Sequence, residues 1–236
     1  EKAMKKTKKY TVIGAGHGGK AMAAHLALMD MEVTLYNRTF DRISAISARG
    51  GIELESYEGG PHGFAKLSAV TSDIREAIIE ADIIMVVVPS SAHKDVSALI
   101  SPHLRDGQTI ILHPGRTCGA IEVAKVLRDH QCKAEITVAE TETFIYASRS
   151  DGPAQVRIFR IKEAIPLAAL PASHTGKVLR LIEDVYPQFI DGENVLSTGL
   201  NNMGAIFHPA LAILNAGRIE STHGDFRFYV EGVTPS

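Results

Sequence analysis

The sequence predicts an α/β protein, a doubly wound sheet followed by the start of an α-helical C-terminal domain. Three observations support this class. A β-branched segment near the N-terminus runs into a glycine-rich turn and then into an alanine-rich helix. Short apolar runs afterwards alternate with helical patterns, as in consecutive βαβ units. A mostly apolar helical stretch then covers 196–217. We therefore expect a sheet domain at 1–190 and the beginning of a helical domain at 191–236.

The glycine-rich turn follows a short strand at 11–13 and reads G-A-G-H-G-G over 14–19. This strand–turn–helix arrangement is typical of the Rossmann-type dinucleotide-binding domain. Gly14 allows the tight turn, Gly16 lets the backbone approach the pyrophosphate, and Gly19 lets the helix pack closely on the strand. The N–H groups at the start of the helix then face the phosphates. The residues that we assign to the cofactor here are Gly14, Gly16, His17, Gly18 and Gly19.

The second strand, at 32–36, indicates which dinucleotide binds. Proteins that prefer NAD carry Asp or Glu at the end of this strand, where the carboxylate bonds the ribose 2′-hydroxyl. Here the position is Asn37, followed by Arg38 and Thr39. A guanidinium pairs with a 2′-phosphate, and the two polar neighbours supply hydrogen bonds. We therefore expect NADP(H), with NAD as the alternative if Arg38 is only a solvated residue at a strand end.

The remaining elements alternate in the same way. Further strands are predicted at 52–55, 65–70, 83–88, 109–112 and 135–139. Helices are predicted at 40–49, 73–80 and 90–100, and another helix follows the Pro-Gly turn at 114–115 and ends at 128. The run at 83–88 is apolar throughout, as expected of a central strand buried on both faces. Beyond residue 140 the pattern is more β-like, at 143–148 and 155–161, before an amphipathic helix at 173–185. The apolar stretch at 196–217 is interrupted by Pro209, and we expect its cover to come from a longer chain or from another subunit.

The composition is that of an ordinary globular protein, with 45% hydrophobic and 22% charged residues among 236. The net charge of −2 gives no reason to expect nucleic acid, because the basic run at 5–9 is confined to the N-terminal tail. Cys118 and Cys132 supply no disulfide framework and are expected to be reduced. Since no apolar run has membrane-spanning length, we expect a cytoplasmic protein with no membrane partner. The uncovered apolar helix favours a homodimer.

Loops at the carboxyl ends of the strands supply the candidate chemistry, because ligands of doubly wound sheets bind there. Hydride transfer needs an apolar slot for a nicotinamide, a proton donor, and cations for substrate carboxylates. The residues assigned to the cofactor in these loops are Val88, Pro89, His93, Pro114 and Gly115, and those assigned to the substrate are Arg116, Glu140 and Thr141. The plainer alternatives are a surface role for Arg116, a helix-surface position for His93, and a positioning role or a simple strand-end charge for Glu140. The histidines lack metal-ligand spacing, so no metal is expected.

A series of short motifs lies in collinear order over nearly the whole chain. They are G-A-G-H-G-G at 14–19, V-V-P-x-x-x-H at 87–93, Pro-Gly and Gly-Ala within 114–120, E-T at 140–141 with Tyr146 and Arg149 downstream, N-V-L at 194–196, N-x-x-x-x-x-H-P at 202–209 and E-G-V-T-P-S at 231–236. In this combination the chain resembles the opine dehydrogenase family, which includes octopine, nopaline and carboxyethyl-amino-acid dehydrogenases.

The resemblance implies a Rossmann domain and a helical domain with the substrate between them. It also implies reductive condensation, in which the amine of an amino acid attacks a 2-oxo acid and NAD(P)H reduces the resulting imine. The family's catalytic histidine falls on His208, whose imidazole can exchange a proton with the substrate near neutral pH. A packed helix histidine is the alternative.

The sequence departs from the family pattern at two places. The family's asparagine one turn earlier is Gly204 here, which leaves Asn202 as the nearest amide for the substrate, and the family's carboxylate partner of the histidine lies beyond these residues.

Two other functions stay open at this point. A 2-oxo acid reductase of the ketopantoate type shares the layout and needs no amine. A dinucleotide-binding remnant without activity is the second alternative, because Gly204 replaces an asparagine and a histidine without its carboxylate is a weaker acid–base group.

Overall fold

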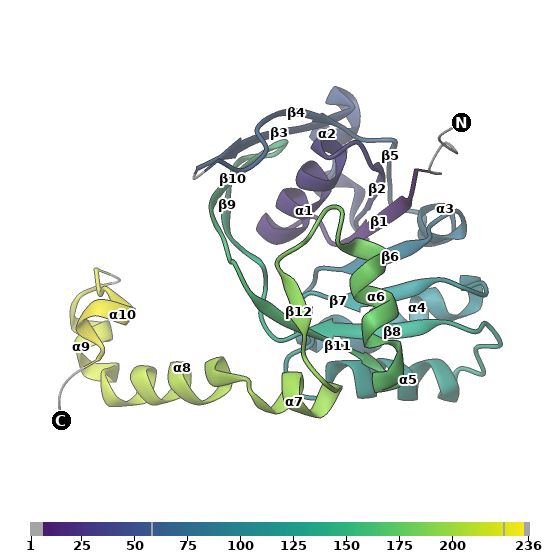
Figure 1. The fold of residues 1–236 in the computed structure, drawn as a ribbon. Helices are drawn as coiled ribbons and strands as arrows, with labels where there is room; N and C mark the ends of the chain where they lie inside the picture. Colours follow the sequence, from purple (N-terminus) through teal and green to yellow (C-terminus); the bar gives the residue numbers. More distant parts are fainter. Residues whose placement is uncertain (1–6, 58, 224, 234–236) are drawn as a thin grey trace. The chain divides into compact units, whose positions relative to one another are not determined.

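The computed structural model describes residues 7–57, 59–223 and 225–233. They divide into two compact units, Glu1–Leu200 and Asn201–Ser236, which are described separately. The first unit contains an eight-stranded sheet flanked by helices and a smaller four-stranded sheet (Figure 1). The α/β class with a doubly wound sheet, expected from the sequence, is confirmed.

The large sheet has the order β12-β11-β8-β7-β6-β1-β2-β5. Its strands are β1 (Lys9–Ile13), β2 (Glu32–Tyr36), β5 (Ala69–Thr71), β6 (Ile83–Val86), β7 (Thr109–Leu112), β8 (Thr137–Thr141), β11 (Ile165–Leu170) and β12 (Phe189–Asp191). All neighbouring strands are parallel except β11, which runs antiparallel to β8. Strand order reverses between β1 and β6, so the crevice for a ligand opens at the carboxyl ends of these two strands.

Helices cover both faces of this sheet and create two hydrophobic cores. One core joins α1 (His17–Leu28) and α6 (Thr175–Ile182) to the sheet, and the other joins α3 (Ile74–Ile79), α4 (His93–Ile100) and α5 (Gly119–Asp129). Asp73 caps α3, because its carboxylate accepts hydrogen bonds from the N–H groups of Arg75 and Glu76. The short η1 (Phe40–Arg42) and α2 (Ser44–Arg49) replace the single helix expected at 40–49, and Gly50 ends α2 in the left-handed region.

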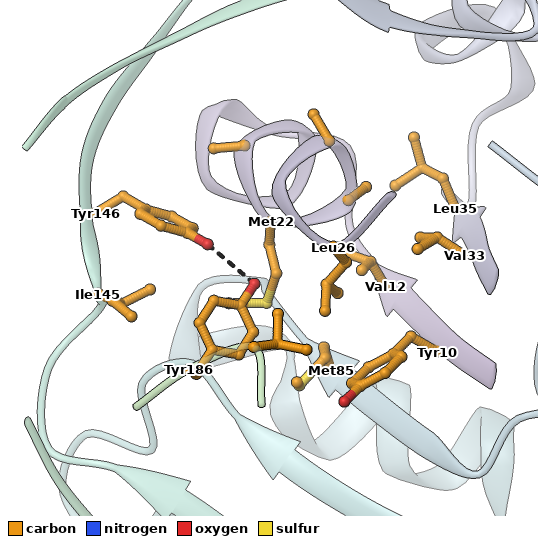
Figure 2. Close-up of a cluster of buried hydrophobic side chains, with 14 of the residues drawn as sticks. Tyr10, Val12, Met22, Leu26, Val33, Leu35, Met85, Ile145, Tyr146 and Tyr186 are labelled. Atoms are coloured by element: carbon orange, nitrogen blue, oxygen red, sulfur yellow. Dashed lines mark hydrogen bonds between the residues drawn. The ribbon is translucent and has the colours of Figure 1, made fainter. Parts of the chain in front are cut away.

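The small sheet was not foreseen as a separate sheet, and it packs over α1. Its order is β4-β3-β10-β9, formed by β4 (Gly63–Lys66), β3 (Gly51–Ser56), β10 (Gln155–Ile161) and β9 (Tyr146–Gly152). Helix α1 contacts all four of these strands as well as β1 and β2. Even its polar residues Lys20 and His25 are therefore buried. Figure 2 shows Met22 and Leu26 of α1 within this core, beside the bonded hydroxyls of Tyr146 and Tyr186.

Three strand predictions need correction. The single strand expected at 65–70 is two strands in different sheets, because the chain turns at Leu67, whose N–H bonds the Gly50 carbonyl. Strand β8 begins at Thr137 rather than at 135. Strands β11 and β12 were not predicted. Strand β11 pairs antiparallel with β8 and parallel with β12, which departs from the βαβ pattern that the sequence analysis followed. The predicted helix at 173–185 is present as η4 (Ala172–His174) followed by α6.

The second unit holds α8 (Met203–Leu214), α9 (Ala216–Ser221) and α10 (Phe228–Glu231), while α7 (Val195–Leu200) belongs to the first unit. The interruption expected at Pro209 is absent, because α8 continues through this proline. A single proline removes only one backbone donor, and the breaks come instead at 201–202 and at Asn215. Several large apolar side chains of this unit are exposed: Met203, Ile206, Ile213, Leu214, Tyr229, Val230 and Val233. Across the residues that the structure describes, every helix is too short or too polar to cross a lipid bilayer.

Candidate functional site

The glycine turn after β1 is shaped by two glycines that no larger residue could replace without movement. Gly14 has φ +109°, and a Cβ there would lie 2.3 Å from the Val87 carbonyl oxygen. A Cβ on Gly19 would lie 1.7 Å from the Gly14 carbonyl oxygen, so the close helix–strand packing expected from the sequence is present. A Cβ on Gly16 would meet nothing within 4 Å. Because the first N–H groups of α1 lack partners within the helix, this open space at its N-terminus suits a phosphate.

The loop after β2 presents the three polar residues that the sequence assigned to the ribose. Asn37 braces this loop, since its Oδ1 accepts from the Ala15 N–H at 3.3 Å and its Nδ2 donates to the Thr39 carbonyl at 2.9 Å. Arg38 and Thr39 are exposed. The Asn37 contact therefore ties the loop to the glycine turn, while the guanidinium of Arg38 is left accessible to a ligand.

An open pocket of about 340 Å³ lies at the switch point of the sheet, next to the glycine turn. Four segments line it, namely the turn, the loop after β6, the end of β7 and the region around the start of β9. The lining residues are Gly16, His17, Gly18, Val87, Val88, Pro89, His113, Phe144, Tyr146 and Ser148. A mostly apolar slot beside a phosphate-binding turn fits a nicotinamide ring, so the residues present suit a dinucleotide cofactor.

Two contacts hold the β9 side of this pocket against the turn. Nδ1 of His17 accepts a hydrogen bond from the Ser150 N–H at 2.8 Å. The Tyr146 hydroxyl lies 2.9 Å from both the His25 Nδ1 and the Tyr186 hydroxyl, so the ring forms the pocket wall while its polar end is bonded in the core. Burial lowers the pKa of His25 to about 4, which keeps this network neutral near pH 7.

His113 immediately follows β7 and precedes a cis peptide bond to Pro114. It is 2% exposed, and its Nε2 lies 3.1 Å from the sulfur of Met85. Its Nδ1 has no hydrogen-bond partner among the described residues. Burial lowers the pKa of His113 to about 3, so the ring is neutral at physiological pH.

Glu140 and Thr141, expected to contact substrate, anchor the loops of the site. Glu140 is fully buried, and its two carboxylate oxygens accept from the Ala120 N–H and the Thr198 hydroxyl, both at 2.7 Å. Thr141 is also fully buried and donates to the Leu112 carbonyl. Burial raises the pKa of Glu140, and its two hydrogen bonds oppose that shift. Neither side chain reaches solvent in this structure, and the substrate contact assigned to them stays a prediction.

The loop after β7 carries the remaining cofactor and substrate candidates. Pro114 and Gly115 are buried, and Gly115 packs so closely on Glu140 that a Cβ would lie 2.3 Å from a carboxylate oxygen. Arg116 is exposed with φ +58° and lies near Lys162, whose pKa is lowered by burial and by this neighbouring charge.

His93, which the sequence also assigned to the cofactor, begins α4 and is 1% exposed, so the alternative of a helix-surface position does not hold. It is not among the residues that line the pocket. Neither of its ring nitrogens has a partner among the described residues.

The second unit carries His208, which is exposed on α8. Its Nε2 lies 2.7 Å from the Tyr229 hydroxyl, and the rings of Phe207 and Phe228 are close to its own. Asn202 stands immediately before α8, and Gly204 lies one turn before His208. Within the described residues, no group of three or more His, Cys, Asp or Glu side chains could hold a metal ion.

Two family models match the chain. The model of the NAD-dependent glycerol-3-phosphate dehydrogenase N-terminus matches 9–143, and that of the NAD/NADP octopine/nopaline dehydrogenase α-helical domain matches 191–236. An opine dehydrogenase of Arthrobacter sp. (strain 1C) is 42% identical over 233 residues, which are 99% of this chain and 64% of that protein. The chain belongs to the opine dehydrogenase family. It spans a little under two thirds of the length of this relative.

Solved structures of octopine and yersinopine dehydrogenases share the fold. An octopine dehydrogenase bound to NADH and L-arginine superposes with a TM-score of 0.77 and 21% identity, over 91% of this chain and 55% of the other. A yersinopine dehydrogenase with NADP⁺ bound gives 0.72 and 15%, over 88% of this chain and 53% of the other. At these identities the likeness shows the fold alone.

For this member of the opine dehydrogenase family, sequence reasoning found the glycine turn and the loop after β6 but missed half of the pocket. The lining residues that it did not assign to the cofactor are Val87, His113, Phe144, Tyr146 and Ser148. Tyr146 had entered only as part of a family motif. His113 was given no role, although its place directly after a buried strand and before Pro-Gly was a usable signal.

Proposed function

We propose that this protein is an NAD(P)H-dependent opine dehydrogenase, which condenses an amino acid with a 2-oxo acid reductively. The observation that carries the proposal is the apolar pocket beside the glycine turn, in a chain 42% identical to an opine dehydrogenase. The amine nitrogen attacks the oxo carbon, water leaves, and hydride addition to the imine carbon yields a secondary amine with two carboxylates. The cofactor supplies that hydride from its nicotinamide.

In this proposal His208 exchanges the protons of the reaction. Its imidazole protonates the carbonyl oxygen as water leaves, and accepts a proton from the amine. Asn202 is the proposed amide contact for substrate, and Arg116 the proposed contact for a substrate carboxylate. The exposed Arg116 guanidinium is suited to pair with a carboxylate in two parallel hydrogen bonds.

We assign NADP(H) as the preferred cofactor. Arg38 is exposed beside the proposed ribose site, Asn37 stands where an NAD-preferring protein has a carboxylate, and Thr39 is accessible. A carboxylate would repel a 2′-phosphate, whereas a guanidinium attracts it. The cofactor residues of the turn and loops, Gly14, Gly16, His17, Gly18, Gly19, Val88, Pro89, Pro114 and Gly115, remain part of this proposal, as does His93 through its unpartnered ring nitrogens.

One observation favours a second function. Gly204 offers no side chain where the family carries an amide, so a binding protein without turnover is the competing proposal. The third candidate function is a reductase that acts on 2-oxo acids alone, because the pocket could also serve a reaction that needs no amine substrate. We also propose a cytoplasmic homodimer, supported by the exposed apolar side chains of α8 and α10.

The deciding experiment follows NADPH oxidation by the purified chain with pooled 2-oxo acids, pooled amino acids, and both pools together. Turnover that requires both pools supports the proposal. Turnover with oxo acids alone identifies a plain reductase, and cofactor binding without any turnover identifies a binding protein. His208→Gln is the control variant, and it should bind NADPH like the unmodified chain while losing turnover.

A further inference from the structure

One buried ring nitrogen in the wall of the pocket has no protein partner. The His113 side chain lines the pocket but is only 2% exposed. Its Nδ1 makes no hydrogen bond within the described residues. A buried polar atom without a partner loses its hydrogen bonds to water and gains none in return, which destabilises the free protein. Such an atom in a ligand pocket therefore points to a ligand group that bonds it.

The other ring nitrogen decides what kind of group that is. Nε2 lies 3.1 Å from the Met85 sulfur. A thioether carries no hydrogen and can only accept, so Nε2 must hold the proton of this contact. Because burial lowers the pKa of His113 to about 3, the ring has a single N–H near neutral pH. Nδ1 is therefore a bare acceptor and requires a donor.

The position of His113 limits the donor further. It follows β7 at the carboxyl edge of the sheet, where its N–H bonds the Val86 carbonyl of β6. The same pocket is also lined by Val87, Val88 and the rings of Phe144 and Tyr146, which provide apolar surfaces suited to a flat heterocycle. The nicotinamide carries one donor group at its edge, the carboxamide NH₂.

We propose that Nδ1 of His113 accepts a hydrogen bond from the carboxamide NH₂ of the bound nicotinamide and thereby orients the ring for hydride transfer. This inference deepens the proposed function and rests on it for the identity of the cofactor. The amine of the substrate is the other N–H donor that could reach such an acceptor, and the test separates the two.

The test compares two variants and two nucleotides by calorimetric binding. His113→Leu removes the acceptor, whereas His113→Asn keeps an oxygen at the position that Nδ1 occupies, and both lose the ring alike. We expect the dissociation constant for NADPH to rise about threefold to tenfold in His113→Leu, which is the range for the loss of one neutral hydrogen bond. In His113→Asn it should rise less than about twofold, because the acceptor is kept. The 3-acetylpyridine analogue of NADPH carries a methyl group in place of the NH₂, so its affinity should be the same for the unmodified chain and His113→Leu.

Several results would overturn the inference. Equal losses for NADPH and the analogue would show a packing role, and a loss seen only in amino acid affinity would move the contact to the substrate. If neither variant changed the affinity for NADPH, the partner of Nδ1 would be a buried water and not the cofactor.

Nitrogen-15 NMR of the unmodified protein provides a check that needs no variant. Nδ1 should be unprotonated in the free protein, and its resonance should move upfield when NADPH is added. If NADPH does not bind the unmodified chain at all, the proposed function fails as well.

Discussion

Replacement of Glu140 should test how the loops of the site are held. Its carboxylate accepts two hydrogen bonds of 2.7 Å from buried groups, the Ala120 N–H and the Thr198 hydroxyl. Glu140→Ala leaves the Ala120 N–H without a partner and opens a cavity, while the Thr198 hydroxyl can turn to the Val195 carbonyl at 3.4 Å. Since a hydrogen bond to a charged group contributes about 1.5–3 kcal/mol, we expect a loss of about 3 kcal/mol in the free energy of unfolding.

The matched variant Glu140→Gln should cost much less, about 1 kcal/mol, because it keeps the volume and one oxygen for Ala120. The folded-state pKa of Glu140 is raised above the ordinary 4.5. The stability contributed by the carboxyl group is therefore fully present below pH 4.5 and declines as the pH rises through the raised value, whereas glutamine does not titrate. The difference between Glu140 and Gln should shrink over that range.

Urea unfolding followed by far-ultraviolet circular dichroism gives these free energies. The Thr198→Val variant, combined with Glu140→Gln, measures the coupling between the two side chains. A loss below 1 kcal/mol for Glu140→Ala, or equal losses for Ala and Gln, would refute the assignment of Glu140 as a buried anchor of these loops.

Three further predictions concern the cofactor turn, the ribose loop and the buried histidines. Arg38→Ala should raise the dissociation constant for NADPH about tenfold and leave that for NADH within twofold, as measured by fluorescence titration; equal losses would contradict the 2′-phosphate assignment. Gly19→Ala should cost about 3 kcal/mol or more in the free energy of unfolding, because its Cβ would meet the Gly14 carbonyl at 1.7 Å. The control Gly217→Ala, in open space on α9, should be neutral or stabilising. The folded pKa of His25 is lowered to about 4, so the unfolded chain takes up its proton first and stability should fall as the pH drops from about 6.5 towards 4. Urea unfolding at several pH values checks this, and a His25→Gln variant with an unchanged decline would disprove it.

Local patterns predicted the parts of this molecule that depend on local physics. The apolar run at 83–88 forms β6 at Ile83–Val86, a strand buried on both faces, because a continuous run of apolar residues has no polar side for solvent. The glycine turn is similar, since Gly14 and Gly19 meet each other across one bend of the chain.

Contacts between segments that are far apart in the chain could not be predicted from such local patterns. Glu140 was assigned to the substrate, because the sequence does not show that the donors of Thr198 and Ala120 lie against its carboxylate. The small sheet pairs β3 with β10, more than ninety residues later in the chain, so its existence could not be read from either strand. Tyr146 of the pocket wall begins β9, which pairs with β10.

The position of α1 between two sheets bears on the order in which the chain can fold during synthesis. Helix α1 leaves the ribosome early, yet two of the strands that cover it, β9 and β10, are complete only at Ile161. Until that residue has emerged, Met22 and its apolar neighbours on α1 lack part of their cover. The nascent dinucleotide fold therefore carries an uncovered apolar helix through much of its translation, a stage at which binding to a chaperone would protect it from aggregation.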